Sequence, residues 1–253
     1  MTKYLGINRK DPTVAFSGNG DILIGKLDAN KSIVGGLIAA GQVGSFSLTT
    51  EEEYDEMQDT RTGKRGIAKK VATATTTTFS GTFKSYHEDL RAILSKATKE
   101  VVAGSDANTI TTNAYLGRSI PVRMLKAITS ITLTSDSTDV TENFVASNNS
   151  VYLDEDQTQF TTQINDGDEV EITYSTHAHT RILPFNAEDD QFVIFFDGLN
   201  MAEGNKPVLV EIPVAQFDAP DSFELISPEG FGEYSVSGTA LSDGEAAYIE
   251  SYV

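Results

Sequence analysis

Cysteine and tryptophan are absent from this 253-residue chain, and each absence excludes a kind of site. Without cysteine there is neither a disulfide framework nor a thiolate metal site, which suits a reducing compartment. Without tryptophan there is no indole surface on which a sugar ring stacks. No apolar run is long enough to span a bilayer, and residues 1–6 lack the features of a signal peptide. We therefore expect neither membrane insertion nor export.

Basic residues are also scarce, with 19 Lys and Arg against 37 Asp and Glu and a net charge of −18. Binding to nucleic acid depends on Lys and Arg that displace phosphate counterions, so stable binding to DNA or RNA is not expected. The acidity serves either solubility or a surface to which a polyanion does not adhere.

Three short patterns resemble catalytic or metal motifs, and each fails on chemistry. Residues 20–27 approach a phosphate-binding loop, but Leu27 offers no hydroxyl and the middle reads as an apolar strand. His177 and His179 share one side of a strand without a third ligand nearby. The acids at 154–156 lack the glycine and glutamate of a calcium loop, so a turn is expected. We expect no catalytic residue, cofactor or metal, and a glycan- or calcium-binding β module stays as an alternative.

Short alternating segments with turn signals between them dominate the chain. Such alternation predicts strands, and threonine-rich sequence favours extended backbone because Cβ branching crowds a helix. Residues 71–83 are an example, since one face carries Phe79 and Phe83 and the other is small and hydroxylated. The strands are expected at 21–26, 42–49, 71–83, 127–134, 149–154, 168–175, 192–197, 206–217 and 230–241.

One helix is expected at about 85–98. Ser85 and Glu88 have the spacing of a capping box, and Leu90, Ile93 and Leu94 follow at helical spacing. The fold class is therefore mainly β, a sandwich or barrel with one flanking helix.

The chain divides into a discontinuous core and an insert. We expect the core at 1–127 and 175–253 and a small inserted β domain at 128–174, because the segments on either side look like parts of one core. Pro207 and Pro213 lie in the strand at 206–217, which indicates an edge, a bulge or two shorter strands.

A connection of about twenty residues, 50–70, lies between two well-patterned strands. Connections of this length tend to be functional or disordered. Acids fill its first half and bases its second, around Thr62 and Gly63. An arm whose acidic half meets a neighbour's basic half would make a head-to-tail contact, which propagates into rings and filaments. The expected contact residues are Glu51, Glu52, Glu53, Asp55, Glu56, Asp59, Arg61, Lys64, Arg65, Lys69 and Lys70.

The order of these features resembles the major tail tube proteins of long-tailed bacteriophages. An apolar strand follows 18–21, then come 41–48, the acidic connection with 62–64 near its tip, the threonine-rich strand and the helix. Residues 152–174 resemble the β insert of some members, and 195–200, 206–217 and 223–226 resemble their closing strands. The resemblance covers nearly the whole chain, and it is carried by the order of these segments along the sequence.

This resemblance implies a structural virion protein related to type VI secretion tube subunits. Such proteins form hexameric rings that stack around a tape measure protein, between a tail terminator and distal tail or baseplate proteins, after assembly in the host cytoplasm. DNA later passes through the bore. The resemblance implies that the connection at 50–70 reaches the adjoining ring and that the insert lies outside the tube. The expected lumen-facing residues are Ser45, Ser47, Thr76, Thr78 and Ser80. A type VI-like tube subunit or a tail-tip protein is the nearest alternative.

Overall fold

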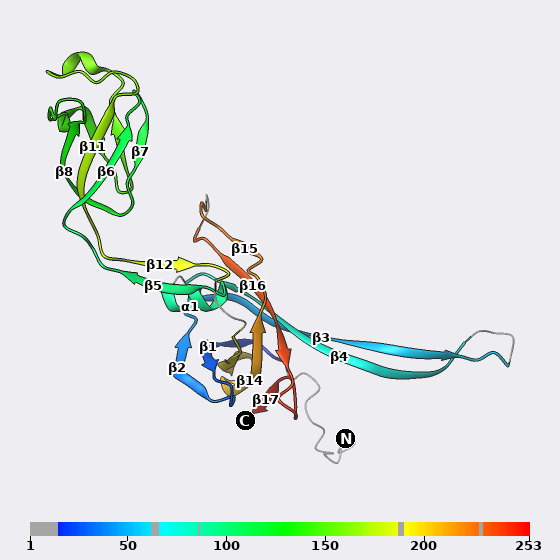
Figure 1. The fold of residues 1–253 in the computed structure, drawn as a ribbon. Coiled ribbons are helices and arrows are strands. Elements are labelled where there is room, and N and C mark those ends of the chain that lie inside the picture. The colour runs from blue at the N-terminus through cyan, green and yellow to red at the C-terminus, as the bar shows by residue number, and fades with distance from the viewer. Residues whose placement is uncertain (1–14, 62–65, 86, 187–189, 228–229) are drawn as a thin grey trace, which may run out of the picture. The chain divides into compact units, whose positions relative to one another are not determined.

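The computed structural model describes residues 15–61, 66–85, 87–186, 190–227 and 230–253. The chain forms two units, a core unit of Met1–Thr98 with Ile182–Val253 and an inserted unit of Lys99–Arg181. The described residues contain one α-helix among many strands (Figure 1). The prediction of a mainly β fold with one helix is confirmed.

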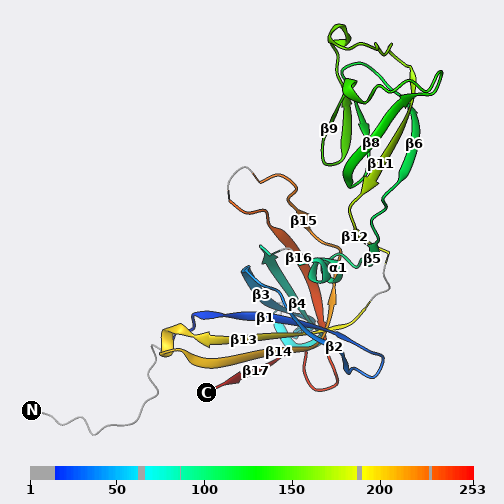
Figure 2. The ribbon, with the colours of Figure 1, turned by 90° about the vertical axis from the view of Figure 1, so that its left-hand side faces the viewer.

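The core unit is built on one large sheet with the strand order β2-β1-β13-β14-β16-β4-β3. All of its strand pairs are antiparallel, and β15 pairs with β16 while β17 pairs with β14 (Figure 2). Its strands are β1 (Gly18–Leu27), β2 (Ile33–Ala39), β3 (Val43–Gln58), β4 (Ile67–Phe83), β13 (Phe192–Asn200), β14 (Lys206–Phe217), β15 (Ser222–Phe223), β16 (Tyr234–Leu241) and β17 (Ile249–Tyr252).

One face of this sheet carries the hydrophobic core. Phe79 and Phe83 of β4 are buried with Phe217 of β14, and the rings of Phe79 and Phe217 meet edge to face at 5.2 Å. The helix α1 (Glu88–Leu94) packs onto this face through Leu90 and Leu94. The parity predicted for 71–83 is confirmed, because alternate residues of a strand point to opposite faces.

The helix is shorter than predicted. Its N-cap is His87, without a side-chain cap, whereas the Ser85 hydroxyl accepts a hydrogen bond from the Gln42 amide at 2.8 Å. The predicted capping box is therefore wrong, because Ser85 stabilises the connection to β3. The C-terminal end is also wrong, because Lys96 has a φ of 48° that a helix does not allow, and β5 begins at Thr98.

The proline-containing strand β14 is continuous and has neighbours on both sides, so of the three predicted alternatives the structure shows the bulge. Its pairing with β13 shifts register between Phe192 and Ile194, opposite the segment that contains Pro213. The other side of β14 also changes partner there, from β17 at Val208–Glu211 to β16 at Val214–Phe217. Proline lacks an amide hydrogen, so a ladder interruption at this position is expected.

The inserted unit is larger than the predicted insert of 128–174. Its strands form two three-stranded sheets, β6-β11-β8 and β7-β10-β9, around thirteen buried apolar residues. The polar strand β6, which pairs along β11 with Ile110 opposite Ile172, extends the unit toward the N-terminus. The strands are β6 (Asn108–Asn113), β7 (Ser119–Pro121), β8 (Leu125–Leu133), β9 (Phe144–Ala146), β10 (Ser150–Leu153) and β11 (Glu169–Thr176).

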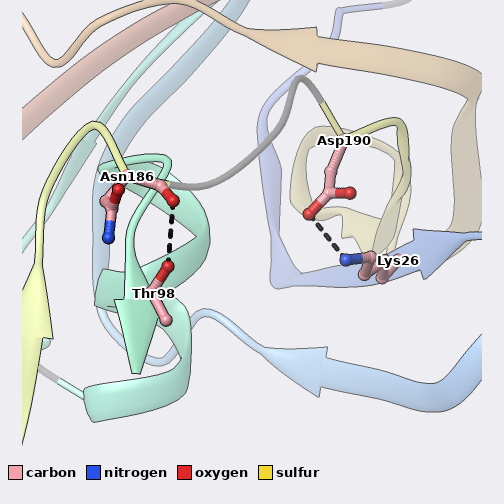
Figure 3. Close-up of polar contacts among 4 residues, drawn as sticks. All are labelled: Lys26, Thr98, Asn186 and Asp190. Carbon is pink, nitrogen blue, oxygen red and sulfur yellow. Dashed lines mark hydrogen bonds and ion pairs between the residues drawn. The ribbon is translucent and has the colours of Figure 1, made fainter. Parts of the chain in front are cut away.

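The chain leaves and rejoins the core unit through a two-stranded ribbon of β5 (Thr98–Val102) and β12 (His179–Leu183). Two contacts fasten the returning segment, as Figure 3 shows: the Thr98 hydroxyl donates to the Asn186 carbonyl at 3.0 Å, and Lys26 pairs with Asp190 at 2.6 Å. The two junctions are therefore paired neighbours, and both are tied down on the core side.

Deleting Lys99–Arg181 and joining Thr98 to Ile182 with a short Gly-Ser linker is expected to leave the core unit folded. The inserted unit has its own apolar core, and paired strands lie about 5 Å apart, so the junction closes without strain. Circular dichroism should show cooperative melting of the deletion variant and of isolated 99–181. A non-cooperative melt for either piece would show that the two units depend on each other.

Candidate self-assembly surface

The connection predicted at 50–70 is mostly strand, because β3 and β4 continue into it. β3 and β4 stay paired from Glu51 opposite Thr76 to Gln58 opposite Ile67 and form a two-stranded ribbon, here called the arm (Figure 1). At about 3.3 Å per residue, residues 51–58 extend roughly 26 Å beyond the sheet. Charged residues obscured the strand signal, because alternation of apolar and polar residues is lost when both faces of a ribbon meet solvent.

The arm begins at a defined boundary. The hydroxyls of Thr50 and Thr77 hydrogen bond at 3.1 Å, and Thr77 is the last residue of β4 on this side that is buried. Beyond it every described residue of β3 and β4 is exposed. The arm therefore projects from the core unit without cover from the described residues.

Tyr54 organises one face of the arm. Its hydroxyl donates to the Glu52 carboxylate, which raises the pKa of Tyr54, with smaller contributions from desolvation and from the Glu52 charge. The Lys70 ammonium lies 3.6 Å from the centre of the Tyr54 ring and 3.9 Å from a Glu56 carboxylate oxygen. The two contacts of Lys70 cross from β4 to β3, whereas the Tyr54–Glu52 hydrogen bond lies within β3.

The predicted contact residues are distributed unevenly along the arm. Glu51, Glu52 and Glu53 lie near its base, opposite uncharged Thr76, Thr75 and Ala74. Nearer the tip, Lys70 pairs with Glu56, and Arg61 lies 3.5 Å from Asp59. Of the other predicted residues, Asp55 lies in β3 and Lys69 in β4, whereas Lys64 and Arg65 lie outside the described residues.

The arm also exposes large apolar side chains. Tyr54, Met57, Ile67 and Val71 are 42–60% exposed. A two-stranded ribbon is marginally stable alone, and apolar side chains that stay exposed to solvent add no stabilisation by burial. The arm therefore has the composition of a segment that is completed by another surface.

Both ends of the core sheet are open. β2 and β3 are the first and last strands of the sheet, and neither has a further partner among the described residues. β2 exposes Ile33, Val34 and Leu37 along this edge. An open, partly apolar edge is a template for pairing with another strand.

The face of the sheet that points away from the core carries hydroxyl groups. Ser45 lies opposite Thr82, Ser47 opposite Ser80 and Thr49 opposite Thr78, and the Ser47 and Ser80 hydroxyls hydrogen bond at 3.0 Å. Of the predicted lumen residues, Ser45, Ser47, Thr78 and Ser80 therefore share one small, polar surface, and Thr76 continues it on the arm. Their side chains are exposed.

The hydroxylated surface is wider than the prediction. β16 adds Ser235, Ser237 and Thr239, which lie opposite Thr82, Ser80 and Thr78. The alternation of these hydroxyls with buried Tyr234 and Val236 was the signal that could have identified them. The register between β16 and β4 was required to place them beside the predicted residues.

The same face becomes acidic farther along the sheet. Val193 and Phe195 pack with Val214 and Leu241 in a small second cluster on this face. Two residues along β13, Asp197 lies directly opposite Asp21 of β1. Like charges opposite each other are destabilising, so this pair does not serve the folding of one copy.

An open groove of about 440 Å³ lies between the β1, β13 and β14 strands and the base of β3. Phe46, Phe196 and Ile212 line it together with polar groups, and among the described residues Glu250 is the only charged one of the lining. The Tyr252 hydroxyl donates to Glu250 at 2.7 Å, which raises the pKa of Tyr252. One acid without a basic partner does not make a catalytic centre.

The motif-like segments have structural roles. Residues 20–27 lie within β1, as expected of an apolar strand. Asp156 caps a short 3₁₀ turn by accepting from the Thr158 amide and hydroxyl, at 3.0 and 2.5 Å, which confirms the predicted turn. His179 contacts the His177 carbonyl at 3.0 Å. Across the described ranges no cluster of three His, Asp or Glu side chains could hold a metal.

The geometry thus defines a mainly β protein with two open sheet edges, a projecting arm and an inserted β unit. The chain belongs to the family described as Protein of unknown function UCP028589, whose model matches residues 15–248. A comparison with curated proteins finds no match. In the part of the chain that the structure describes, no helix is long and apolar enough to cross a membrane.

Proposed function

We propose that this protein is a structural subunit that polymerises head to tail into a tube. The observation that carries the proposal is the arm, a two-stranded ribbon whose described residues are exposed throughout and include Tyr54, Met57 and Ile67. The open edges β2 and β3 would pair between copies within a ring, and the arm would reach the next ring. A contact between unlike surfaces propagates, which suits a filament.

The resemblance to major tail tube proteins of long-tailed bacteriophages names the kind of tube. In that role the subunits form stacked rings, six copies each, around a tape measure protein, and contact a tail terminator and the distal tail or baseplate. The protein is then a virion component without enzymatic activity. The inserted unit lies outside the tube.

The hydroxylated and acidic face would line the bore. Ser47, Ser80 and Ser237 offer small neutral groups, and Asp21 and Asp197 repel phosphate. DNA in transit needs weak contacts, and Lys or Arg on this face would hold it. A role in repelling DNA phosphate would explain why Asp21 lies opposite Asp197, although this arrangement is unfavourable for folding.

The proposal is tested by concentrating the purified full-length chain and imaging it by negative-stain electron microscopy, with analytical ultracentrifugation in parallel. We expect rings and tubes, and a sedimenting fraction that grows with protein concentration. A chain that stays monomeric throughout the series contradicts the proposal. Rings that never stack would favour the tail-tip alternative, and a monomer that responds to calcium or a glycan would favour a binding module.

A further inference from the structure

The connection between β15 and β16 exposes three large apolar side chains. Leu225, Ile226 and Phe231 are 83%, 87% and 84% exposed. The backbone amide of Glu224 donates to the Glu233 carbonyl at 3.2 Å, so the two sides of this connection are held together. Single exposed apolar residues are ordinary, but three on one connection are a concentration of the kind found at protein interfaces. The described residues 218–227 and 230–233, which include β15, are called the receiving loop below.

The receiving loop is acidic. Its described residues contain no Lys or Arg and four acids, giving −4. The acids are Asp218, Asp221, Glu224 and Glu233, and Lys84 pairs with Glu233 at 3.1 Å. An apolar patch with an acidic rim fits a partner that is apolar and basic.

The distal arm has that composition. The described residues 57–61 and 66–70, here called the distal arm, contain three bases and one acid, giving +2 in a chain of −18. Met57 and Ile67 are 60% and 59% exposed and share one face of the ribbon with Lys69. The distal arm and the receiving loop are therefore complementary both in charge and in apolar surface.

The two surfaces lie at opposite ends of the same strands. Along β4 and β16, Tyr234 pairs with Phe83 where the receiving loop begins, and Ala240 pairs with Thr77 where the arm begins. Figure 1 shows the β15–β16 end and the arm leaving the sheet at different places. The arm of one copy therefore extends away from its own receiving loop, whereas copies stacked along the strand direction bring an arm against the next copy's loop.

We propose that the receiving loop of one copy docks the distal arm of the next copy in the stack. The inference rests on the proposed polymerisation and names the surface that the arm contacts. Leu225, Ile226 and Phe231 pack against Met57 and Ile67, and Glu224 faces Lys69, which shares the ribbon face of Met57 and Ile67.

A charge swap tests this contact. Lys69→Glu, and separately Glu224→Lys, should each lower the polymer yield by about tenfold or more, and the two changes together should restore most of it. Glu169→Lys, at an exposed position of the inserted unit, is the matched control for net charge and should assemble normally. All variants are first checked for unchanged thermal melting.

The absence of cysteine permits a second test that needs no charge change. One copy carries Met57→Cys and another carries Phe231→Cys, and a short bismaleimide is added to the mixed polymer. We expect a dimer that contains one copy of each variant, and little dimer from either variant alone.

The outcomes separate the two proposals. A wild-type chain that forms no polymer overturns both. A wild-type polymer without charge-swap rescue, or without the mixed crosslink, overturns only the docking of the arm on the receiving loop. Crosslinking of the arm to another protein in place of a second copy also overturns it.

Discussion

Removing Glu53–Ala74 and joining Glu52 to Thr75 through Asn-Gly is expected to abolish tubes while leaving the monomer folded. Glu52 and Thr75 are paired, so a two-residue turn closes the hairpin in register. The removed side chains of β3 and β4 are exposed, and none of the removed residues belongs to the core cluster around Phe79. Ultracentrifugation and negative-stain microscopy measure the loss.

The expected size of this effect follows from apolar burial. The arm carries four half-exposed large side chains, Tyr54, Met57, Ile67 and Val71. Full burial of such a side chain contributes about 1.5–3 kcal/mol, so losing even part of the four costs roughly 3 kcal/mol per contact, or about 100-fold in the concentration needed to polymerise. The deletion of Lys99–Arg181 is the control, because it removes more chain and should still polymerise. A truncated-arm variant that forms normal tubes would show that the arm is dispensable.

Ala39→Pro is expected to block pairing at the open edge of β2 without disturbing the monomer. The Ala40 amide donates to the Ile22 carbonyl at 2.8 Å, so by alternation the amide of Ala39 points away from β1. Proline at this position removes an outward donor and leaves the inward ladder intact. When an edge contact loses one donor, one acceptor on the partner is left without a hydrogen bond. The contact then weakens by about 1–3 kcal/mol, or roughly 10–100-fold.

Ala39→Val is the matched control, because it keeps the outward amide and the extended backbone. We expect rings and tubes from Ala39→Val and neither from Ala39→Pro, with both variants melting within a few degrees of wild type. Equal polymerisation of the two variants would mean that β2 is not an edge used between copies. The arm and the β2 edge are separate surfaces, so the two variants should fail differently. The arm deletion should give rings that do not stack, and Ala39→Pro should give no rings.

The strands of the core were predictable because each is patterned by its own burial. In 71–83 the alternation of Phe79 and Phe83 with threonine reports a strand with one face on the core. The same reasoning failed for the arm, where both faces of 51–58 are exposed and no alternation exists. The same reasoning also failed for β6. Its residues are mostly polar and it is held by backbone pairing with β11, so the sequence shows no apolar alternation there.

The helix shows why local motifs mislead at element ends. Ser85 and Glu88 have the right spacing for a capping box, but the Ser85 hydroxyl is engaged by the Gln42 amide, a residue 43 positions away. A contact of this kind depends on how β3 meets β4. No window of sequence around the helix contains it.

The amino-acid sequence by itself determined the mainly β class, the apolar parity of the core strands, the acidity and the two-signed segment at 50–70, because composition and alternation are properties of the chain alone. The tertiary structure decided which residues share a surface. It placed Ser235, Ser237 and Thr239 beside the predicted hydroxyls, turned the two-signed segment into a ribbon, and set the arm and the receiving loop at opposite ends of β4 and β16. The physical reason is that strand register is fixed by backbone pairing between distant segments, and their alignment is not recorded in either segment alone.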